Sequence, residues 1–455
     1  MGLVEITRRL AEFAACTPPS LISDDARTHA RRAMLDTLGV ALAGSREDVA
    51  KKVAELACAQ GGIEEATLLG RPGKLPAAEA ALVNGTAAHS LDYDDVQANM
   101  RGHPSVPLLP AVLALGEKFG ASGRDVLDAF VIGFEIECKL GRAIGGPHYA
   151  LGWHATSTLG TLGAAAACSR LLRLDAAQTQ TALGIAASLA SGVRQNFGTM
   201  TKPLHTGWAA RNGVVAAALA AGGLTADARA LEGENGFLRA MSGGAEIDAA
   251  AAVRDLGEPW EIISPGIAVK LYPCCYATHR AIDAAVAIRG ASGAAIADAE
   301  RVEVVVTPGT LSPLIRRLPE TGLEAKFSMQ YCVAAALIDG DVCFGTFGEA
   351  AVARAEVRRL MACVEVSEAG PQGQFPIEGS ATVILYTADA VKHSRTVETP
   401  RGDPRNPLTW EQLLTKFRDC AGLALPEERI ERAVELIERW DELPDVRETA
   451  AALSG

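Results

Sequence analysis

Residues 157–172 read STLGTLGAAAACSRLL, an apolar run built almost entirely from Ala, Gly, Leu and small polar residues. A second run, VVAAALAAGG, covers residues 214–223. Both are too short and too rich in Gly for a membrane span, and small side chains favour close contact between helices. Hydrophobic residues make up 49% of the chain but aromatic residues only 5%. The sequence therefore predicts a core of Ala, Leu and Val in closely packed helices.

The helical pattern extends through about the first 256 residues. In one segment Ser23 is expected to be the N-cap, two acids follow it in the first turn, and Gly44 is expected to cap the end. Further helices are predicted over residues 76–90, 108–119, 123–140, 157–172, 175–192 and 209–221. So many helices in one stretch predict an all-α domain.

The composition changes after Pro265. Runs rich in Val, Ile and Thr predict strands over residues 302–306, 363–366, 381–386 and 391–399, with helices at 278–290 and 329–338 between them. After Pro400, Thr409 and Gln412 have the spacing of a capping box, and residues 426–443 predict a charged helix. The prediction is a mainly α fold with an α+β second domain: helical domain 1–265, α+β domain 266–400, and C-terminal helices 401–455 that rejoin the first domain.

Charge and cysteine content limit the classes of partner. The chain has 455 residues and a net charge of −12, which disfavours nucleic acid and anionic membranes as partners. The N-terminal residues lack the apolar segment of a secretory signal, so a cytoplasmic location is expected. The ten cysteines include no CxxC pair, so we expect no metal site or cluster, and Cys274 and Cys275 are expected to be buried, inert thiols.

Four polar segments stand out from this apolar background. They cover residues 89–105, 152–158, 195–207 and 270–280, and each contains histidine. Each segment taken alone also fits a solvated loop or a helix cap. The motifs of nucleotide-binding loops, nucleophile elbows and zinc proteases are absent. Acids, imidazoles, an ammonium group and phenols without a cofactor motif indicate proton transfer on an anionic substrate.

Short motifs in these segments resemble those of one enzyme family. In chain order they are LDYDD (91–95), GHPS (102–105), WHAT (153–156), KPLH (202–205), YP (272–273), THR (278–280), FSMQY (327–331), GDP (402–404) and NP (406–407). Together they resemble the MmgE/PrpD family, which includes 2-methylcitrate dehydratases, cis-aconitate decarboxylases and iminodisuccinate epimerase.

The resemblance implies a helical domain with an inserted α+β lid, a homodimer, and a site that needs no metal or other cofactor. It implies the catalytic residues Asp92, His103, His154, Lys202 and His279, and the substrate-binding residues His205, Tyr272, Arg280 and Tyr331.

The resemblance leaves the reaction open, because fold does not determine chemistry. Val96 stands where many relatives have Thr, and residues 274–276 differ from other branches of the family. The leading hypothesis is a cofactor-independent lyase, a dehydratase or decarboxylase, that acts on a di- or tricarboxylate such as 2-methylcitrate or cis-aconitate. The alternatives are an epimerase of a substituted succinate such as iminodisuccinate, and a catalytically silent anion-binding protein.

Overall fold

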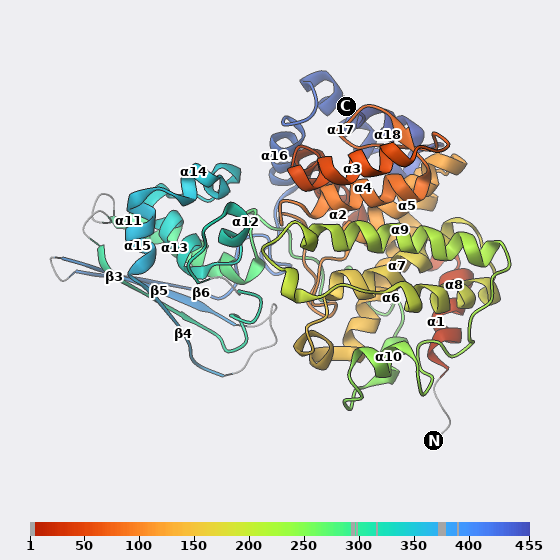
Figure 1. Ribbon diagram of the computed structural model, residues 1–455, viewed down its shortest axis with the longest axis horizontal. Coiled ribbons are helices and arrows are strands. Elements are labelled where there is room, and N and C mark those ends of the chain that lie inside the picture. The colour runs from red at the N-terminus through yellow and green to blue at the C-terminus, as the bar shows by residue number, and fades with distance from the viewer. Residues whose placement is uncertain (1–4, 293–295, 297–298, 315–316, 372–378, 389–390) are drawn as a thin grey trace. The chain divides into compact units, whose positions relative to one another are not determined.

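The computed structural model describes residues 5–292, 296, 299–314, 317–371, 379–388 and 391–455 (Figure 1). The cytoplasmic location was expected from the N-terminal residues, and residues 1–4 of that segment lie outside the described residues. The chain divides into two compact units. The first contains Met1–Gln195, Thr201–Ile267 and Thr409–Gly455, and the second contains Asn196–Met200 and Ala268–Leu408. The predicted fold class, mainly α with an α+β portion, is confirmed.

The first unit is helical, apart from a small hairpin of β1 (Ala66–Thr67) and β2 (Lys74–Leu75). Its helices are α1 (Ile6–Cys16), α2 (Asp24–Gly44), α3 (Asp48–Gln60), α4 (Ala77–His89), α5 (Ser105–Phe119), α6 (Gly123–Ala150), α7 (Ala155–Leu171), α8 (Ala176–Leu189), α9 (Thr201–Ala221), α10 (Phe237–Met241), α16 (Trp410–Ala421), α17 (Glu427–Glu438) and α18 (Arg447–Ala452). Helix α7 contains most of the first apolar run and packs against α5, α6, α8 and α9. Every residue from Ala155 to Ser169 is buried, which explains its small side chains.

Several helix ends differ from the prediction, and two of them have a clear physical reason. Gly44 is the last residue of α2 rather than its cap, and it is needed because a methyl group there would overlap the carbonyl oxygen of Ala87 in α4. The predicted cap Ser23 is confirmed, since its hydroxyl accepts from the Ala26 amide. Helix α9 begins at Thr201, eight residues before the predicted start. Its polar first turn hid the start, and Pro203 fits there because the first turn needs no amide donor.

Helices α4 and α9 approach each other unusually closely. A Cβ atom on Gly85 would lie 3.1 Å from the Cα atom of Gly207, and one on Gly207 would overlap the Leu82 carbonyl oxygen. The Thr206 hydroxyl donates to the Gly85 carbonyl oxygen at 2.6 Å, across the same contact. Glycine in both helices therefore allows their backbones to pack without intervening side chains.

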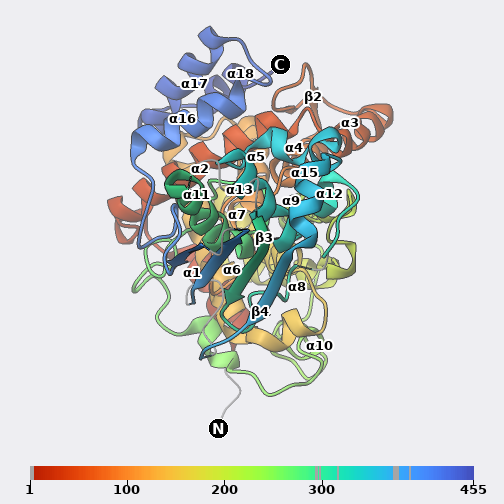
Figure 2. The same ribbon diagram turned by 90° about the vertical axis from the view of Figure 1, so that its left-hand side faces the viewer.

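The C-terminal helices pack on the N-terminal part of the helical unit. The predicted capping box is confirmed, because the side chains of Thr409 and Gln412 each accept from the other's backbone amide. Helix α16 then lies along α2, where Phe417 packs on Gly39 (Figure 2). No helix within the described ranges is both long enough and apolar enough to cross a membrane.

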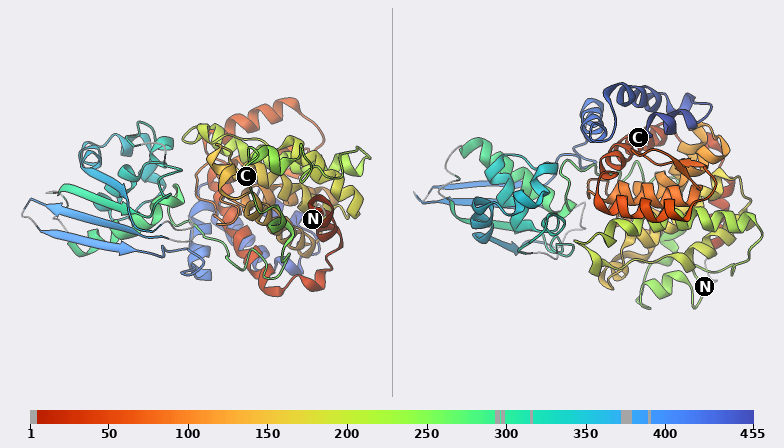
Figure 3. Two further views of the ribbon diagram at one scale, coloured as in Figure 1. Left: turned by 90° about the horizontal axis from the view of Figure 1, so that it is seen from below. Right: turned by 45° about the horizontal axis from the view of Figure 1, so that its top comes forward.

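The second unit is a four-stranded sheet with helices on one face (Figure 3). The strand order is β4-β3-β5-β6, and β3 runs parallel to β4 and antiparallel to β5. The strands are β3 (Ala299–Val306), β4 (Val364–Glu368), β5 (Ala381–Thr387) and β6 (Lys392–Val397); the helices are α11 (His279–Ser292), α12 (Gly322–Ala325), α13 (Met329–Asp339), α14 (Glu349–Val352) and α15 (Ala355–Ala362). Alternate residues of β3 and β5 are buried, so one face of the sheet forms this unit's core with α11, α13 and α15.

Candidate active site

The loop after α4 carries most of the site. Helix α4 ends at His89, and Asp92 follows with a φ of 53°, a left-handed conformation that is uncommon outside glycine. The Asp92 amide donates to the His89 carbonyl oxygen at 3.2 Å, which closes this turn. A strained conformation of this kind persists only where the surrounding structure holds it.

Contacts at two places fix the rest of this loop. At one bend, the side-chain amides of Gln97 and Asn99 both donate to Glu261, at 3.1 and 2.7 Å. Near its end, Gly102 packs directly on Thr156 of α7, and the His103 amide donates to the Thr156 hydroxyl at 3.1 Å. The imidazole of His103 is therefore held against the beginning of α7.

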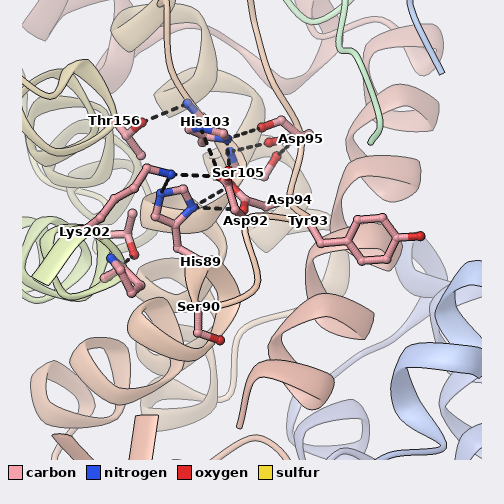
Figure 4. Close-up of polar contacts among 12 residues, drawn as sticks. His89, Ser90, Asp92, Tyr93, Asp94, Asp95, His103, Ser105, Thr156 and Lys202 are labelled. Atoms are coloured by element: carbon pink, nitrogen blue, oxygen red, sulfur yellow. Dashed lines mark hydrogen bonds and ion pairs between the residues drawn. The ribbon is translucent and has the colours of Figure 1, made fainter. Parts of the chain in front are cut away.

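The Asp94 carboxylate joins two imidazoles. Its oxygens lie 2.9 and 3.0 Å from Nδ1 of His89, and one of them lies 2.9 Å from Nδ1 of His103 (Figure 4). Nδ1 of His103 also lies 2.8 Å from the Asp95 carbonyl oxygen. Carboxylate and carbonyl oxygens only accept here, so the hydrogen of each imidazole is assigned to Nδ1.

The Lys202 ammonium joins this group from the first turn of α9. Nζ donates to Nε2 of His89 at 2.9 Å and to Oδ1 of Asp92 at 2.8 Å (Figure 4). Only 4% of the Lys202 surface is exposed. Nε2 of His103 lies 3.9 Å from the same Asp92 oxygen. A buried cation, two carboxylates and two imidazoles thus lie within reach of one another.

A second pair of histidines lies beside Lys202. Nδ1 of His154, at the start of α7, lies 3.1 Å from Nδ1 of His205 in α9. One of these nitrogens must donate and the other accept, so the two neutral rings take opposite tautomers. Burial, assisted by the Lys202 charge, lowers the pKa of His205 to about 4 and that of His154 well below its usual range. Both rings are therefore neutral at pH 7.

The pKa values of His89 and Asp94 are shifted as well. Burial lowers the pKa of His89 to about 3, and the Asp94 charge only partly opposes that effect. Burial would raise the pKa of Asp94, but the two imidazoles that donate to it outweigh burial and hold the pKa well below its usual range. The site therefore contains an ionised Asp94 beside a neutral His89.

Two further buried carboxyl groups lie near this loop. Asp95 accepts from the Ser105 hydroxyl, and burial raises its pKa to about 8. Glu137 of α6 packs against Gly160 and Gly163, and burial together with Asp95 raises its pKa well above the usual range. Both carboxyl groups are therefore mainly protonated at pH 7.

The same loop contains a possible set of metal ligands. Ligand atoms of His89, Asp92, Asp94 and His103 lie within 4.8 Å of one another. Their polar atoms already bond to one another and to Lys202, however, and a divalent cation would have to displace that ammonium group. We therefore assign no ion to these residues.

The other predicted site residues lie in the second unit. His279 begins α11, and its ring packs between Tyr272 and Tyr276, with centroids 5.1 Å away on each side. Arg280 donates to the Glu398 carbonyl oxygen at 2.7 Å. The Tyr272 hydroxyl donates to Asp283 at 2.6 Å.

Tyr331 lies in the core of the second unit. It is fully buried in α13, and its hydroxyl donates to the Thr346 carbonyl oxygen. This bond holds the hydroxyl within the second unit, and the substrate contact of Tyr331 stays a prediction.

Cys274 and Cys275 are buried, as predicted. Burial would raise the pKa of the Cys274 thiol, but hydrogen bonds with Cys332, His279 and Thr278 lower it well below its usual range. The Thr278 hydroxyl lies 3.2 Å from Cys274 Sγ. A lowered pKa favours the thiolate, but Cys274 is fully buried, so its inertness stays a prediction.

The structure thus gathers five of the nine predicted residues in the helical unit: Asp92, His103, His154, Lys202 and His205. Tyr272, His279, Arg280 and Tyr331 belong to the other unit. The sequence analysis did not select His89 and Asp94. Their place in the first polar segment was the available signal, but spacing could not show that Asp94 joins two imidazoles.

The comparisons with known proteins identify the family. Residues 8–250 match the MmgE/PrpD N-terminal domain, and residues 272–442 match the MmgE/PrpD C-terminal domain. The chain therefore belongs to the MmgE/PrpD family, and the predicted resemblance is confirmed.

Several curated relatives match the chain over nearly its full length. A cis-aconitate decarboxylase of Mus musculus is 31% identical, with 100% of this chain and 94% of the relative covered. The Homo sapiens cis-aconitate decarboxylase is 30% identical, with 100% and 96% covered. A cis-aconitate decarboxylase of Aspergillus terreus is 27% identical, with 97% and 94% covered.

Proposed function

We propose that this protein is a lyase that removes carbon dioxide from cis-aconitate or a closely similar tricarboxylate. The relatives named above are cis-aconitate decarboxylases, and they align with this chain nearly from end to end. One observation in this chain carries the proposal. The Lys202 ammonium is buried and bonded to both Asp92 and His89, where a free surface lysine would lie in water.

The reaction needs a cation and a proton donor. When the CH2-carboxylate arm of cis-aconitate loses carbon dioxide, its bonding electrons form a new C=C bond. The electrons of the old double bond then take up one proton at the former alkene carbon. A fixed cation stabilises the negative charge that develops, and a nearby acid supplies the proton. We assign both tasks to Lys202. Asp92 and His103 are its proposed acid–base partners.

The neutral histidines support an anionic substrate. Because His154 and His205 are uncharged at pH 7, each is able to gain a proton when a carboxylate arrives nearby. Such a proton would add positive charge at the moment when the substrate brings negative charge. His279 and Arg280 remain proposed site residues because of the family resemblance. The roles proposed above involve residues of the helical unit alone.

Proton NMR in deuterated water tests the reaction. The protein is incubated separately with cis-aconitate, citrate, 2-methylcitrate and iminodisuccinate. We expect cis-aconitate to yield carbon dioxide and methylenesuccinate that carries one deuterium. Gain or loss of water without loss of carbon would indicate a dehydratase, and deuterium exchange without net loss would indicate an epimerase. No change in any substrate would indicate an anion-binding protein, and each of these three outcomes would replace the proposal.

A variant pair links the activity to the site. Lys202→Met removes the charge and the proton but keeps the length of the side chain, and turnover should fall about a hundredfold or more. Lys51→Met is the matched control, because Lys51 is an exposed helix residue 3.4 Å from Asp48. Its turnover should stay near that of the parent. Equal turnover in both variants would remove Lys202 from the site.

A further inference from the structure

We propose that Asp94 and His89 are a positioning pair that holds the Lys202 ammonium in place and fixes which nitrogen of His103 accepts a proton. The pair serves the site described above, so the inference rests on the proposed function. Neither residue belongs to the set that the family resemblance implied.

The Asp94 carboxylate accepts from both imidazoles, and at His103 the Asp95 carbonyl oxygen accepts beside it. Nδ1 of His89 and Nδ1 of His103 each lie 2.9 Å from an Asp94 oxygen. A carboxylate has no hydrogen to donate, so both Nδ1 atoms must. Each ring then has its lone pair on Nε2. In His89 that lone pair accepts from Lys202, and in His103 it faces Asp92 at 3.9 Å.

The alternative tautomer would disrupt the site. If the hydrogen of His89 were on Nε2, two donors would face each other across the 2.9 Å that separates this atom from Lys202 Nζ. The ammonium group would lose one of its hydrogen bonds, and its position beside Asp92 would change. If the hydrogen of His103 were on Nε2, that atom would no longer accept a proton. Without Asp94, His89 is free to adopt either form, while His103 keeps the Asp95 carbonyl oxygen 2.8 Å from its Nδ1 as an acceptor.

Serine proteases show how large such an effect can be. There, a buried Asp orients the catalytic His, and replacement by Asn lowers turnover about 10⁴-fold because the wrong tautomer is favoured. Here one carboxylate orients two rings, and both Asp94 and His89 are fully buried. Because water is excluded from both residues, protein contacts determine which tautomer the His89 ring adopts.

Asp94→Asn gives the most direct test. Asn offers one acceptor oxygen and an amide donor. Because the Asp95 carbonyl oxygen still accepts from Nδ1 of His103, we expect the amide donor to face His89 and to make its Nδ1 accept. We expect turnover to fall a hundredfold or more while KM changes less than threefold. Circular dichroism confirms that the variant is folded. Near-parental turnover in a folded Asp94→Asn variant would overturn the proposal.

Two substitutions of His89 separate its two bonds. Asn at position 89 places an amide donor near the former Nδ1, where it still bonds Asp94 but offers nothing to Lys202. Gln places a carbonyl oxygen near the former Nε2, where it accepts from Lys202 without bonding Asp94. Because holding Lys202 is the task nearer the chemistry, His89→Gln should retain at least tenfold more turnover than His89→Asn. If both variants lose the same fraction of turnover, His89 is a packing residue and the proposal is overturned. This comparison does not depend on whether Asp94→Asn folds.

Nitrogen NMR of histidine-labelled protein provides a readout that needs no substrate. We expect His89 and His103 to show Nδ1–H signals in the parent, with His89 changed to Nε2–H in Asp94→Asn. His148→Gln is the control, because His148 is another buried histidine of this unit, bonded through Nε2 to the Thr158 hydroxyl at 2.9 Å. The His148→Gln variant should lack the signals of His148 and leave those of His89 and His103 unchanged.

The two proposals fail in different ways. Unchanged tautomers in Asp94→Asn would overturn the positioning pair even if the parent decarboxylates cis-aconitate. The expected tautomer change in a parent that turns over none of the four substrates would refute the proposed function and leave the positioning pair standing.

Discussion

The buried contact between Lys202 and Asp92 predicts a strong energetic coupling between the two residues. Their charged atoms lie 2.8 Å apart, and each side chain is about 5% exposed. At an effective dielectric constant of about 20, the attraction is about 6 kcal/mol. Desolvation offsets much of it, and removal of one partner from a buried pair usually costs about 3–5 kcal/mol because the other charge is left behind.

A double-mutant cycle measures this coupling. Lys202→Met keeps the side-chain volume, and Asp92→Asn suits the left-handed backbone at that position, since Asn tolerates positive φ better than most residues. Each single variant should lower the free energy of unfolding by about 3–5 kcal/mol. The double variant contains neither charge, so it should lose at least about 1 kcal/mol less than the sum.

Urea unfolding at pH 7, followed by circular dichroism, provides the four free energies. Lys51→Met serves again as the control and should stay within about 0.5 kcal/mol of the parent. The reasoning would be refuted by a Lys202→Met variant as stable as the parent. Single effects that add within about 0.5 kcal/mol would refute it as well, because the two charges would then be independent.

Three further predictions concern ionisation, metal and assembly. The folded pKa of Asp95 is about 8, above its unfolded value of about 3.9, so the stability it contributes is present at low pH and is lost as pH rises to about 8. Asp95→Asn lacks that loss, so its stability relative to the parent should rise by up to about 1.4 kcal/mol per pH unit between pH 4 and 8 in urea titrations; a flat difference would contradict the raised pKa. Turnover should survive exhaustive chelation, and recovery of lost turnover on addition of a metal would show that the set around His89 binds an ion. We propose a homodimer, so light scattering should give about twice the 47.4 kDa of the chain, and a stable monomer at micromolar concentration would refute this.

The sequence predicted the helices and strands best where packing and local signals agree. The capping box at Thr409 and the β-branched runs of β3 and β5 are local features that a short window contains. Gly44 misled the prediction because glycine ends helices and also permits close packing, and only the neighbouring Ala87 distinguishes the two roles. The polar first turn of α9 misled it as well, since these residues face a buried polar site.

The site was partly predictable for a similar reason. The family resemblance implied Asp92, His103 and Lys202, and the polar segments that contain them stand out from an apolar background. The bond from Lys202 to His89 joins residues 113 positions apart, and no local pattern contains it. Asp94 lies among neighbouring acids that look alike in sequence. Burial raises the pKa of Asp95 despite its bond from Ser105, whereas two imidazoles hold the pKa of Asp94 low.

The glycine contact between α4 and α9 has a consequence for how this enzyme tolerates sequence change. His89 ends α4 and Lys202 lies at the start of α9, so the distance between their nitrogens depends on how closely these two helices approach. One methyl group added at Gly85 or Gly207 would separate the backbones and lengthen that bond, although neither glycine contributes a reacting atom. Screens for altered substrate preference should therefore leave this pair of positions unchanged, because a loss of activity there would reflect helix spacing and reveal nothing about substrate recognition.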